Sequence, residues 1–120
     1  MQKNNEHIST GQTGEALACK YVMDKGFLIL ETNWRYSHSE VDIIASKENV
    51  LHFFEVKTRK SKLFGLPETS VGNKKMNKLK EAAQAYLYEN PQWKLLQFNI
   101  LSIVMAKNEP IEYFVIEDVF

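Results

Sequence analysis

The chain has 120 residues, a length typical of one domain, and its 44% hydrophobic residues are enough to build a buried core. Lysine and arginine balance aspartate and glutamate, so the overall charge excludes no partner and favours none. The single cysteine cannot form an internal disulfide. Residues 1–12 have no signal-peptide pattern, and no apolar run approaches the roughly 20 residues that a membrane helix needs. We therefore expect a cytoplasmic protein with no membrane partner.

The first predicted elements are a flexible arm and a helix. Residues 1–10 are polar and predict an arm that precedes a single domain over residues 11–120. A capping pattern at Ser9 and Gln12 and an apolar stripe predict a helix through about Lys25. Glu15 lies near the start of this helix, where the helix dipole stabilises a carboxylate.

Three strands are predicted next. Residues 27–31 predict the first strand, and residues 32–39 a connection. Residues 40–45 and 50–57 are rich in β-branched and aromatic side chains and predict two more strands. Asp42 in one of them, and Glu55 and Lys57 in the other, conflict with their apolar surroundings. Such a conflict favours a functional site.

These two strands are predicted to form a hairpin with Glu48 and Asn49 in its loop. A two-residue loop would pair Asp42 with Glu55, and Glu40 with Lys57. Directly opposed residues share a face, so Asp42, Glu55 and Lys57 should converge. From the residues alone, an ordinary cross-strand ion pair on a solvated face is the alternative.

Two converging carboxylates repel each other unless one is protonated or a cation lies between them. Oxygen ligands suit Mg²⁺, which takes only one or two carboxylates from a protein and keeps several waters. A lysine beside a metal-bound water can help to remove its proton or stabilise negative charge. The predicted chemistry is phosphodiester hydrolysis.

The second half of the chain contains a loop, a helix and two strands. Residues 61–72 predict a long loop, residues 73–89 a helix, and residues 95–105 and 111–115 two strands. The order of the elements predicts an α/β (α+β) fold with a central mixed five-stranded sheet flanked by helices.

Basic residues cluster on both sides of the predicted loop. The segment 57–80 has eight basic residues and one acidic residue, Glu68. Such a cluster often forms a solvated surface, but its position directly after the charged strands favours binding of nucleic-acid phosphates. The predicted phosphate-binding residues are Arg59, Lys60, Lys62, Lys74, Lys75 and Lys78.

Asp42 followed by Glu55-Val56-Lys57 on the next strand resembles the core of the PD-(D/E)xK nuclease superfamily, which has the restriction-endonuclease-like fold. The chain resembles more closely the YraN-type family of small bacterial proteins, itself similar to archaeal Holliday junction resolvases. The resemblance covers about residues 11–120, and its main motifs are Gly11-Gln12-Thr13-Gly14-Glu15, Asn33-Trp34-Arg35, Glu40-Val41-Asp42-Ile43-Ile44 and Phe54-Glu55-Val56-Lys57-Thr58-Arg59. Ser39 replaces a usual glycine, and Gln97-Phe98-Asn99 replaces a usual Arg-Phe-Asp.

The resemblance implies a DNA endonuclease that depends on Mg²⁺ or Mn²⁺ and acts on branched or flapped DNA in repair or recombination. The implied catalytic residues are Asp42, Glu55, Lys57 and Glu15, and the expected metal ligands are Asp42, Glu55 and the Val56 carbonyl. Resolvase-like nucleases often act as symmetric dimers, so a homodimer is a further expectation by analogy. Two alternatives stay open: a nucleic-acid-binding protein that keeps the fold without catalysis, and an interaction module whose basic surface meets an acidic protein.

Overall fold

The structure is a computed structural model, and it describes residues 10–60 and 73–119. Five strands form one sheet in the order β1-β2-β3-β4-β5. Strands β3 and β4 are parallel and the other neighbours are antiparallel. The elements are α1 (Thr10–Asp24), β1 (Leu28–Tyr36), β2 (Ser39–Lys47), β3 (Val50–Arg59), α2 (Asn73–Glu89), β4 (Leu95–Val104) and β5 (Glu112–Ile116).

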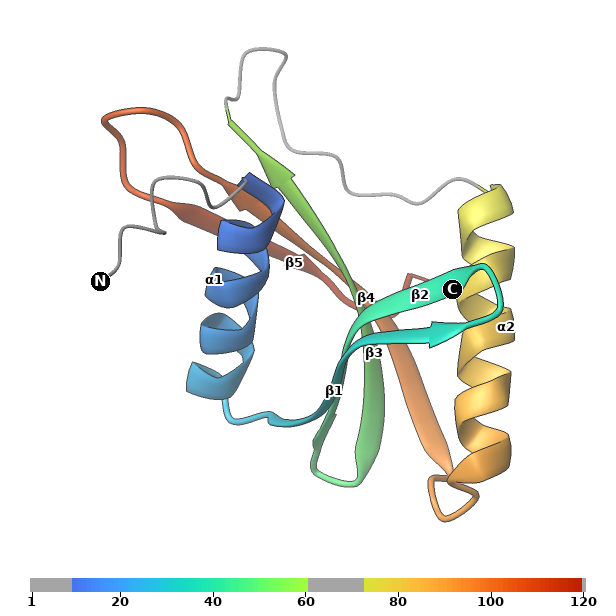
Figure 1. The fold of residues 1–120 in the computed structure, drawn as a ribbon. Helices are drawn as coiled ribbons and strands as arrows, with labels where there is room; N and C mark the ends of the chain where they lie inside the picture. The colour runs from blue at the N-terminus through green and yellow to red at the C-terminus, as the bar shows by residue number, and fades with distance from the viewer. Residues whose placement is uncertain (1–9, 61–72, 120) are drawn as a thin grey trace, which may run out of the picture.

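The two helices lie on opposite sides of the sheet (Figure 1). Helix α1 packs mainly on β3 and β1, and α2 packs on β2 and β1. The prediction of a mixed five-stranded sheet flanked by helices is therefore confirmed, and this α+β fold is consistent with a restriction-endonuclease-like architecture. None of the described helices is both long enough and apolar enough to cross a membrane.

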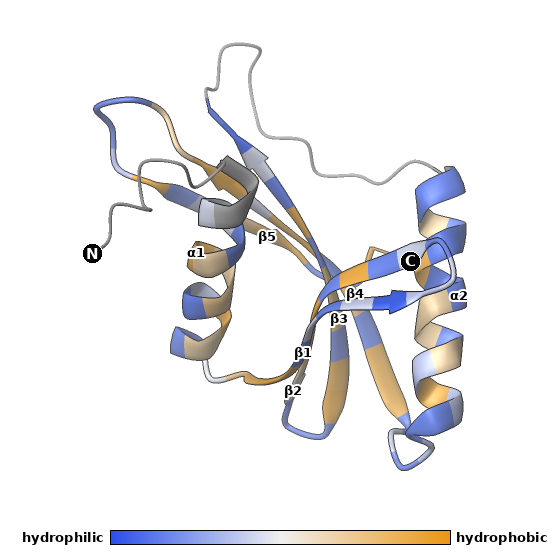
Figure 2. Cartoon of the chain, in the orientation of Figure 1, coloured by the Kyte–Doolittle hydropathy of each residue, from blue (hydrophilic) through white to orange (hydrophobic). Residues whose placement is uncertain are grey.

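Each helix contributes to its own half of the core. On the α2 side, buried residues of the helix meet the sheet in a cluster that includes Leu79, Ala82, Ala83, Val41, Ile44, Leu51 and Phe53. On the α1 side the cluster includes Ala18, Val22, Ile43, Ala45, Phe54, Leu101 and Ile103. The middle of the sheet is accordingly hydrophobic in Figure 2, whereas the first turn of α2 is hydrophilic.

Helix α1 lies close against the sheet at Gly14. A Cβ atom on this residue would collide with the Thr58 side chain on β3. Only glycine permits this approach without a shift of the helix or the strand. Gly14 therefore determines how close the start of α1 lies to the second half of β3.

Most predicted helix and strand boundaries agree with the structure, but the predicted end of the first strand does not. Helix α2 begins and ends at the predicted residues, whereas β1 continues to Tyr36, so the predicted connection over residues 32–39 is wrong for most of its length. Strand β1 is an edge strand, and its second half is mostly exposed. Polar residues are tolerated on such an edge, so the apolar alternation that reveals a strand is missing.

Two predicted segments cannot be compared with the structure. Apart from Thr10, which begins α1, the predicted arm over residues 1–10 lies outside the described residues. The predicted loop over residues 61–72 lies outside them as well.

The β2–β3 hairpin has the predicted register over its inner part. Lys47 pairs with Val50, and the ladder continues to Ile43 and Phe54, where the pairing ends. The predicted pairs Asp42–Glu55 and Glu40–Lys57 are therefore wrong as strand pairs. Beyond this point the end of the β1–β2 hairpin turns toward α2, while β3 continues in another direction (Figure 1).

Candidate active site

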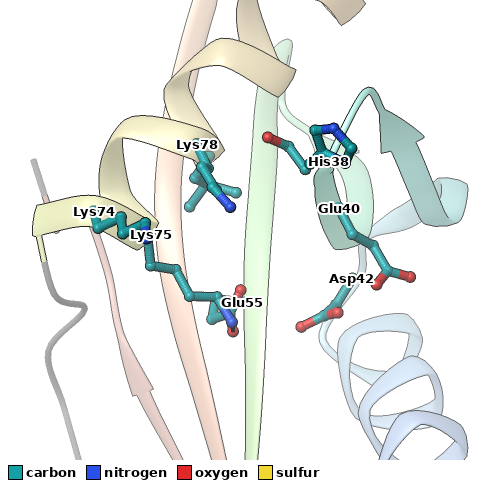
Figure 3. A pocket seen from close by; sticks show the side chains of 9 residues that line it. His38, Glu40, Asp42, Glu55, Lys74, Lys75 and Lys78 are labelled. Atoms are coloured by element: carbon teal, nitrogen blue, oxygen red, sulfur yellow. Dashed lines mark ion pairs between the residues drawn. The ribbon is translucent and has the colours of Figure 1, made fainter.

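A cleft of about 540 Å³ lies where β2 and β3 diverge, next to the first turns of α2. Figure 3 shows acidic side chains of β2 and β3 facing lysines of α2 across this cleft. The residues that line it are His38, Ser39, Glu40, Asp42, Glu55, Lys74, Lys75, Lys78 and Leu79. The structure thus brings both predicted acidic metal ligands together with three of the predicted phosphate-binding lysines.

Directly beyond the last β2–β3 backbone pair, the side chain of Asp42 takes the place of a backbone acceptor. Its Oδ2 atom accepts a hydrogen bond from the Val56 backbone N–H at 2.7 Å. Burial raises the pKa of Asp42 to about 7; the Val56 hydrogen bond opposes this shift, and the Glu55 and Glu40 carboxylates reinforce it. In the absence of metal, this carboxyl therefore protonates near neutral pH, and a cation that binds here competes with that proton.

Glu55 is the most deeply buried acidic side chain of the cleft, with only 7% of the side chain exposed. Its Oε2 atom lies 2.7 Å from Nζ of Lys75, which extends from α2 into the cleft (Figure 3). The hydrogen bond to Glu55 raises the pKa of Lys75, so this lysine stays charged. Lys75 thus places a positive charge in direct contact with the buried carboxylate.

Lys57 occupies a different position from the one predicted. It lies two residues after Glu55 on β3, half-buried and opposite Ser102 of β4, but it does not line the cleft. The sequence placed Lys75 on the phosphate-binding surface and Lys57 at the carboxylates, whereas the structure places Lys75 against Glu55. In the sequence, Lys75 stood out only as one of several lysines at the start of the second helix. That pattern did not indicate that Lys75 contacts Glu55.

The other predicted residues are more widely spread. Glu15 is exposed on α1 and does not line the cleft. Arg59, at the end of β3, donates a hydrogen bond to the Thr58 carbonyl, and Lys60 is exposed directly after it; neither lines the cleft. Lys62 lies outside the described residues.

Sequence reasoning missed some of the residues that line the cleft. His38 and Ser39 lie at the β1–β2 turn, where the sequence predicted a connection rather than the end of a hairpin. Glu40 lies in the cleft with Asp42 and Glu55, as the sequence predicted, but its Oε1 atom lies 3.8 Å from Arg35 on the neighbouring strand instead of facing Lys57. The turn residues could have been placed at the cleft only if the first strand had been predicted to extend to Tyr36, as β1 does.

The donor atoms of the cleft fit a hard divalent cation. Among the described residues, no three or more His, Cys, Asp and Glu side chains form a group that could hold a metal. Mg²⁺ needs only one or two carboxylates, however, and Asp42 and Glu55 supply two. The N–H and C=O of one strand residue point to the same side, so the Val56 carbonyl faces the gap where Asp42 lies.

Comparisons with known proteins find relatives that match most of this chain. The UPF0102 protein of Flavobacterium psychrophilum is 40% identical over 116 residues, which are 96% of this chain and 96% of the relative. The UPF0102 protein of Dictyoglomus turgidum is 40% identical over 86% of both chains, and that of Bacteroides thetaiotaomicron is 45% identical over 68% of both. The family model described as "Uncharacterised protein family UPF0102" matches residues 14–103, so the chain belongs to the UPF0102 family, the YraN-type family that its motifs resemble.

Proposed function

We propose that this protein is a Mg²⁺-dependent DNA endonuclease that hydrolyses phosphodiester bonds. One observation carries the proposal: Asp42 and Glu55 line one cleft at the point where two paired strands diverge, with lysines on the opposite wall. Carboxylates that would bind a cation and ammonium groups that would bind phosphates are the groups that phosphodiester hydrolysis needs in one place.

Each side chain has a distinct role in this proposal. Asp42, Glu55 and the Val56 carbonyl would hold the metal. The bound Mg²⁺ would supply an activated water and neutralise charge on the scissile phosphate. The ammonium groups of Lys74 and Lys78 would bind neighbouring phosphates, since both residues line the cleft.

Lys75 is a stronger candidate than Lys57 for the lysine that acts beside the carboxylates. Its side chain is 59% exposed, so its ammonium group can turn from Glu55 to a phosphate oxygen without leaving the cleft. A cation that binds Glu55 would weaken the ion pair and release Lys75 for that contact. Lys57 keeps the role implied by the family resemblance as a competing proposal.

The decisive experiment measures cleavage of branched, flapped, single-stranded and duplex DNA with Mg²⁺ or Mn²⁺. Asp42→Asn and Glu55→Gln should each lower the rate by at least about 10²-fold, the usual scale for a positioned catalytic group. Asp24→Asn, an exposed change on α1, is the matched control. Equal cleavage by wild type and Asp42→Asn would mean that the activity does not depend on this metal site.

A second proposal is a DNA-binding protein without catalysis. The observation that favours it is the Glu55–Lys75 ion pair, which gives the buried carboxylate a partner without any metal. This function predicts DNA binding in the presence of a chelator and no cleavage of any of the four substrates with either metal. Cleavage that Asp42→Asn abolishes would exclude it.

A further inference from the structure

A second cavity, of about 480 Å³, lies on the opposite face of the sheet from the active-site cleft. It is bounded by the C-terminal end of α1, the turn that joins β2 and β3, and parts of β3, β4 and β5. The end of α1 and this turn both lie toward the bottom of Figure 1. No lining residue is shared with the cleft, so any ligand of this cavity would bind independently of the proposed nuclease site.

The polar base of this cavity has a defined hydrogen-bonding pattern. Asn99 is buried on β4, and its Oδ1 atom accepts a hydrogen bond from the Asp118 backbone N–H at 3.2 Å. A backbone N–H can only donate, which settles the orientation of the Asn99 amide. The Nδ2 atom of Asn99 therefore donates to Nδ1 of His52, at 2.9 Å.

The same network determines the tautomer of His52. Because Nδ1 accepts a hydrogen bond, the ring carries its proton on Nε2. Burial lowers the pKa of His52, which keeps the ring neutral near pH 7. His52 is 7% exposed and lines the cavity, and among residues 10–60 and 73–119 nothing accepts a hydrogen bond from Nε2.

Gln97 supplies an acceptor beside this donor. It lies directly opposite His52 in the β3–β4 ladder, and its Nε2 atom donates to Asn99 Oδ1 at 3.1 Å. Its Oε1 atom is therefore the one left for a ligand, and Gln97 also lines the cavity. A fixed donor and a fixed acceptor thus lie side by side, the pattern that complements the edge of a nucleobase or an amide.

The walls of the cavity are aromatic and its rim is charged. Phe27 packs edge-on against both His52 and Phe54, with ring centroids 4.8 Å and 5.3 Å apart. The ammonium group of Lys25 lies over Tyr21, and that of Lys47 lies over Phe27. Aromatic walls suit a flat heterocycle, and two ammonium groups at the rim suit a phosphate attached to it.

We propose that this cavity is a nucleotide-binding site, in which the base pairs with His52 and Gln97 and the phosphate contacts Lys25 and Lys47. The carboxylates of Glu48 and Glu117 also line the cavity and balance the two lysines, which favours one phosphate over a polyphosphate. The ligand is either a free mononucleotide or the terminal nucleotide of a nucleic-acid strand, since both present the same base and phosphate.

The test is a titration of the isotope-labelled full chain, followed by nuclear magnetic resonance, with the four ribonucleoside 5′-monophosphates and with a 5′-phosphorylated oligonucleotide. We expect saturable shifts of the His52, Phe27 and Gln97 signals with at least one monophosphate. Saturation by both kinds of probe would assign the terminal nucleotide of a strand, and saturation by a monophosphate alone would assign a free nucleotide.

Lys25→Ala should weaken this binding about tenfold, the usual effect of one lost ammonium–phosphate contact. Lys20→Ala is the matched control, because Lys20 is an exposed lysine five residues earlier, on α1, and does not line the cavity. No saturable shift up to about 10 mM, well above the concentrations at which nucleotide sites bind, would overturn the proposal. Shifts confined to cleft residues such as His38 would overturn it as well. Neither result depends on whether the protein cleaves DNA.

Discussion

Asp42 is a partly buried carboxyl whose charge changes near neutral pH. Burial raises its pKa to about 7 in the metal-free folded protein, from an ordinary value of 3.8. The folded state therefore binds this proton more tightly than the unfolded state does. The stability that follows is fully present below about pH 4 and is lost as the pH rises through 7.

This linkage predicts the effect of Asp42→Asn on stability. In a chelating buffer the variant should be more stable than wild type at pH 8, by about 1–3 kcal/mol, because it removes an ionised carboxylate from a partly buried site. Its amide oxygen can still accept the Val56 hydrogen bond, so the difference should vanish near pH 4. Urea unfolding at both pH values measures this, with Asp24→Asn as the exposed control. A difference that does not change with pH would contradict the argument.

Lys75 tests which lysine belongs to the carboxylates. Lys75→Ala leaves the buried Glu55 without its ion-pair partner and should lower the free energy of unfolding by about 1–2 kcal/mol in the absence of metal. Bound Mn²⁺ would replace the lost positive charge, so the variant should gain more in Tm from Mn²⁺ than wild type does. Thermal unfolding with and without Mn²⁺ measures both effects.

Lys78→Ala is the matched control for Lys75→Ala, since Lys78 lines the same cleft from the same helix. It should leave both the metal-free stability and the gain from Mn²⁺ close to wild type. If Lys57→Ala, and not Lys75→Ala, reproduced the predicted pattern, the role of the carboxylate-bound lysine would return to Lys57.

At the scale of elements, the position of α1 depends on the contact between Gly14 and Thr58 of β3, where there is no room for a side chain on Gly14. Gly14→Ala places a methyl group against Thr58 of β3 and should destabilise the protein by about 1–3 kcal/mol, the usual cost of overpacking. The closest atom is a methyl carbon of Thr58, so Gly14→Ala combined with Thr58→Ser should recover part of the loss. Denaturant unfolding of the single and double variants decides this; no loss in Gly14→Ala would show that the helix can move away.

Helix α2 presents its lysines to the cleft, and this arrangement predicts how DNA binding depends on salt. Each phosphate contact contributes a log–log slope of about −0.9 on duplex DNA. Neutralising Lys74, Lys75 and Lys78 together should flatten the slope by about two to three units and weaken all sequences alike. Affinities at several salt concentrations measure this, with Lys107→Gln in the β4–β5 connection as the control. An unchanged slope would place the DNA on another surface.

For the whole molecule, metal binding and folding should be coupled. A cation that binds the folded cleft and not the unfolded chain stabilises the protein by about 2.7 kcal/mol at one hundred times its Kd. Calorimetry should therefore show a Tm that rises with Mg²⁺ or Mn²⁺ and returns to its starting value with a chelator. Asp42→Asn and Glu55→Gln should abolish the rise, and a rise retained in both variants would place the metal elsewhere.

The sequence by itself determined the features that depend on local patterns. The helical period over residues 73–89 predicted α2 at its observed bounds, and the short turn at Glu48 and Asn49 determined the inner register of the β2–β3 hairpin. The same register predicted that Asp42 and Glu55 lie near each other, because each lies six positions from that turn, and both line the cleft although they are not paired. The period of a helix and the loop of a hairpin involve only near neighbours in the chain.

Only the tertiary structure decided where the strands part and which lysine meets Glu55. The ladder ends at Ile43 and Phe54 because the Asp42 side chain takes the Val56 N–H and the hairpin end bends toward α2. Lys75 reaches Glu55 because Leu79, Ala82 and Ala83 pack α2 on the sheet, a contact between segments far apart in sequence. Such contacts depend on how whole faces fit together, and a pattern that records only neighbours along the chain contains no information about that fit.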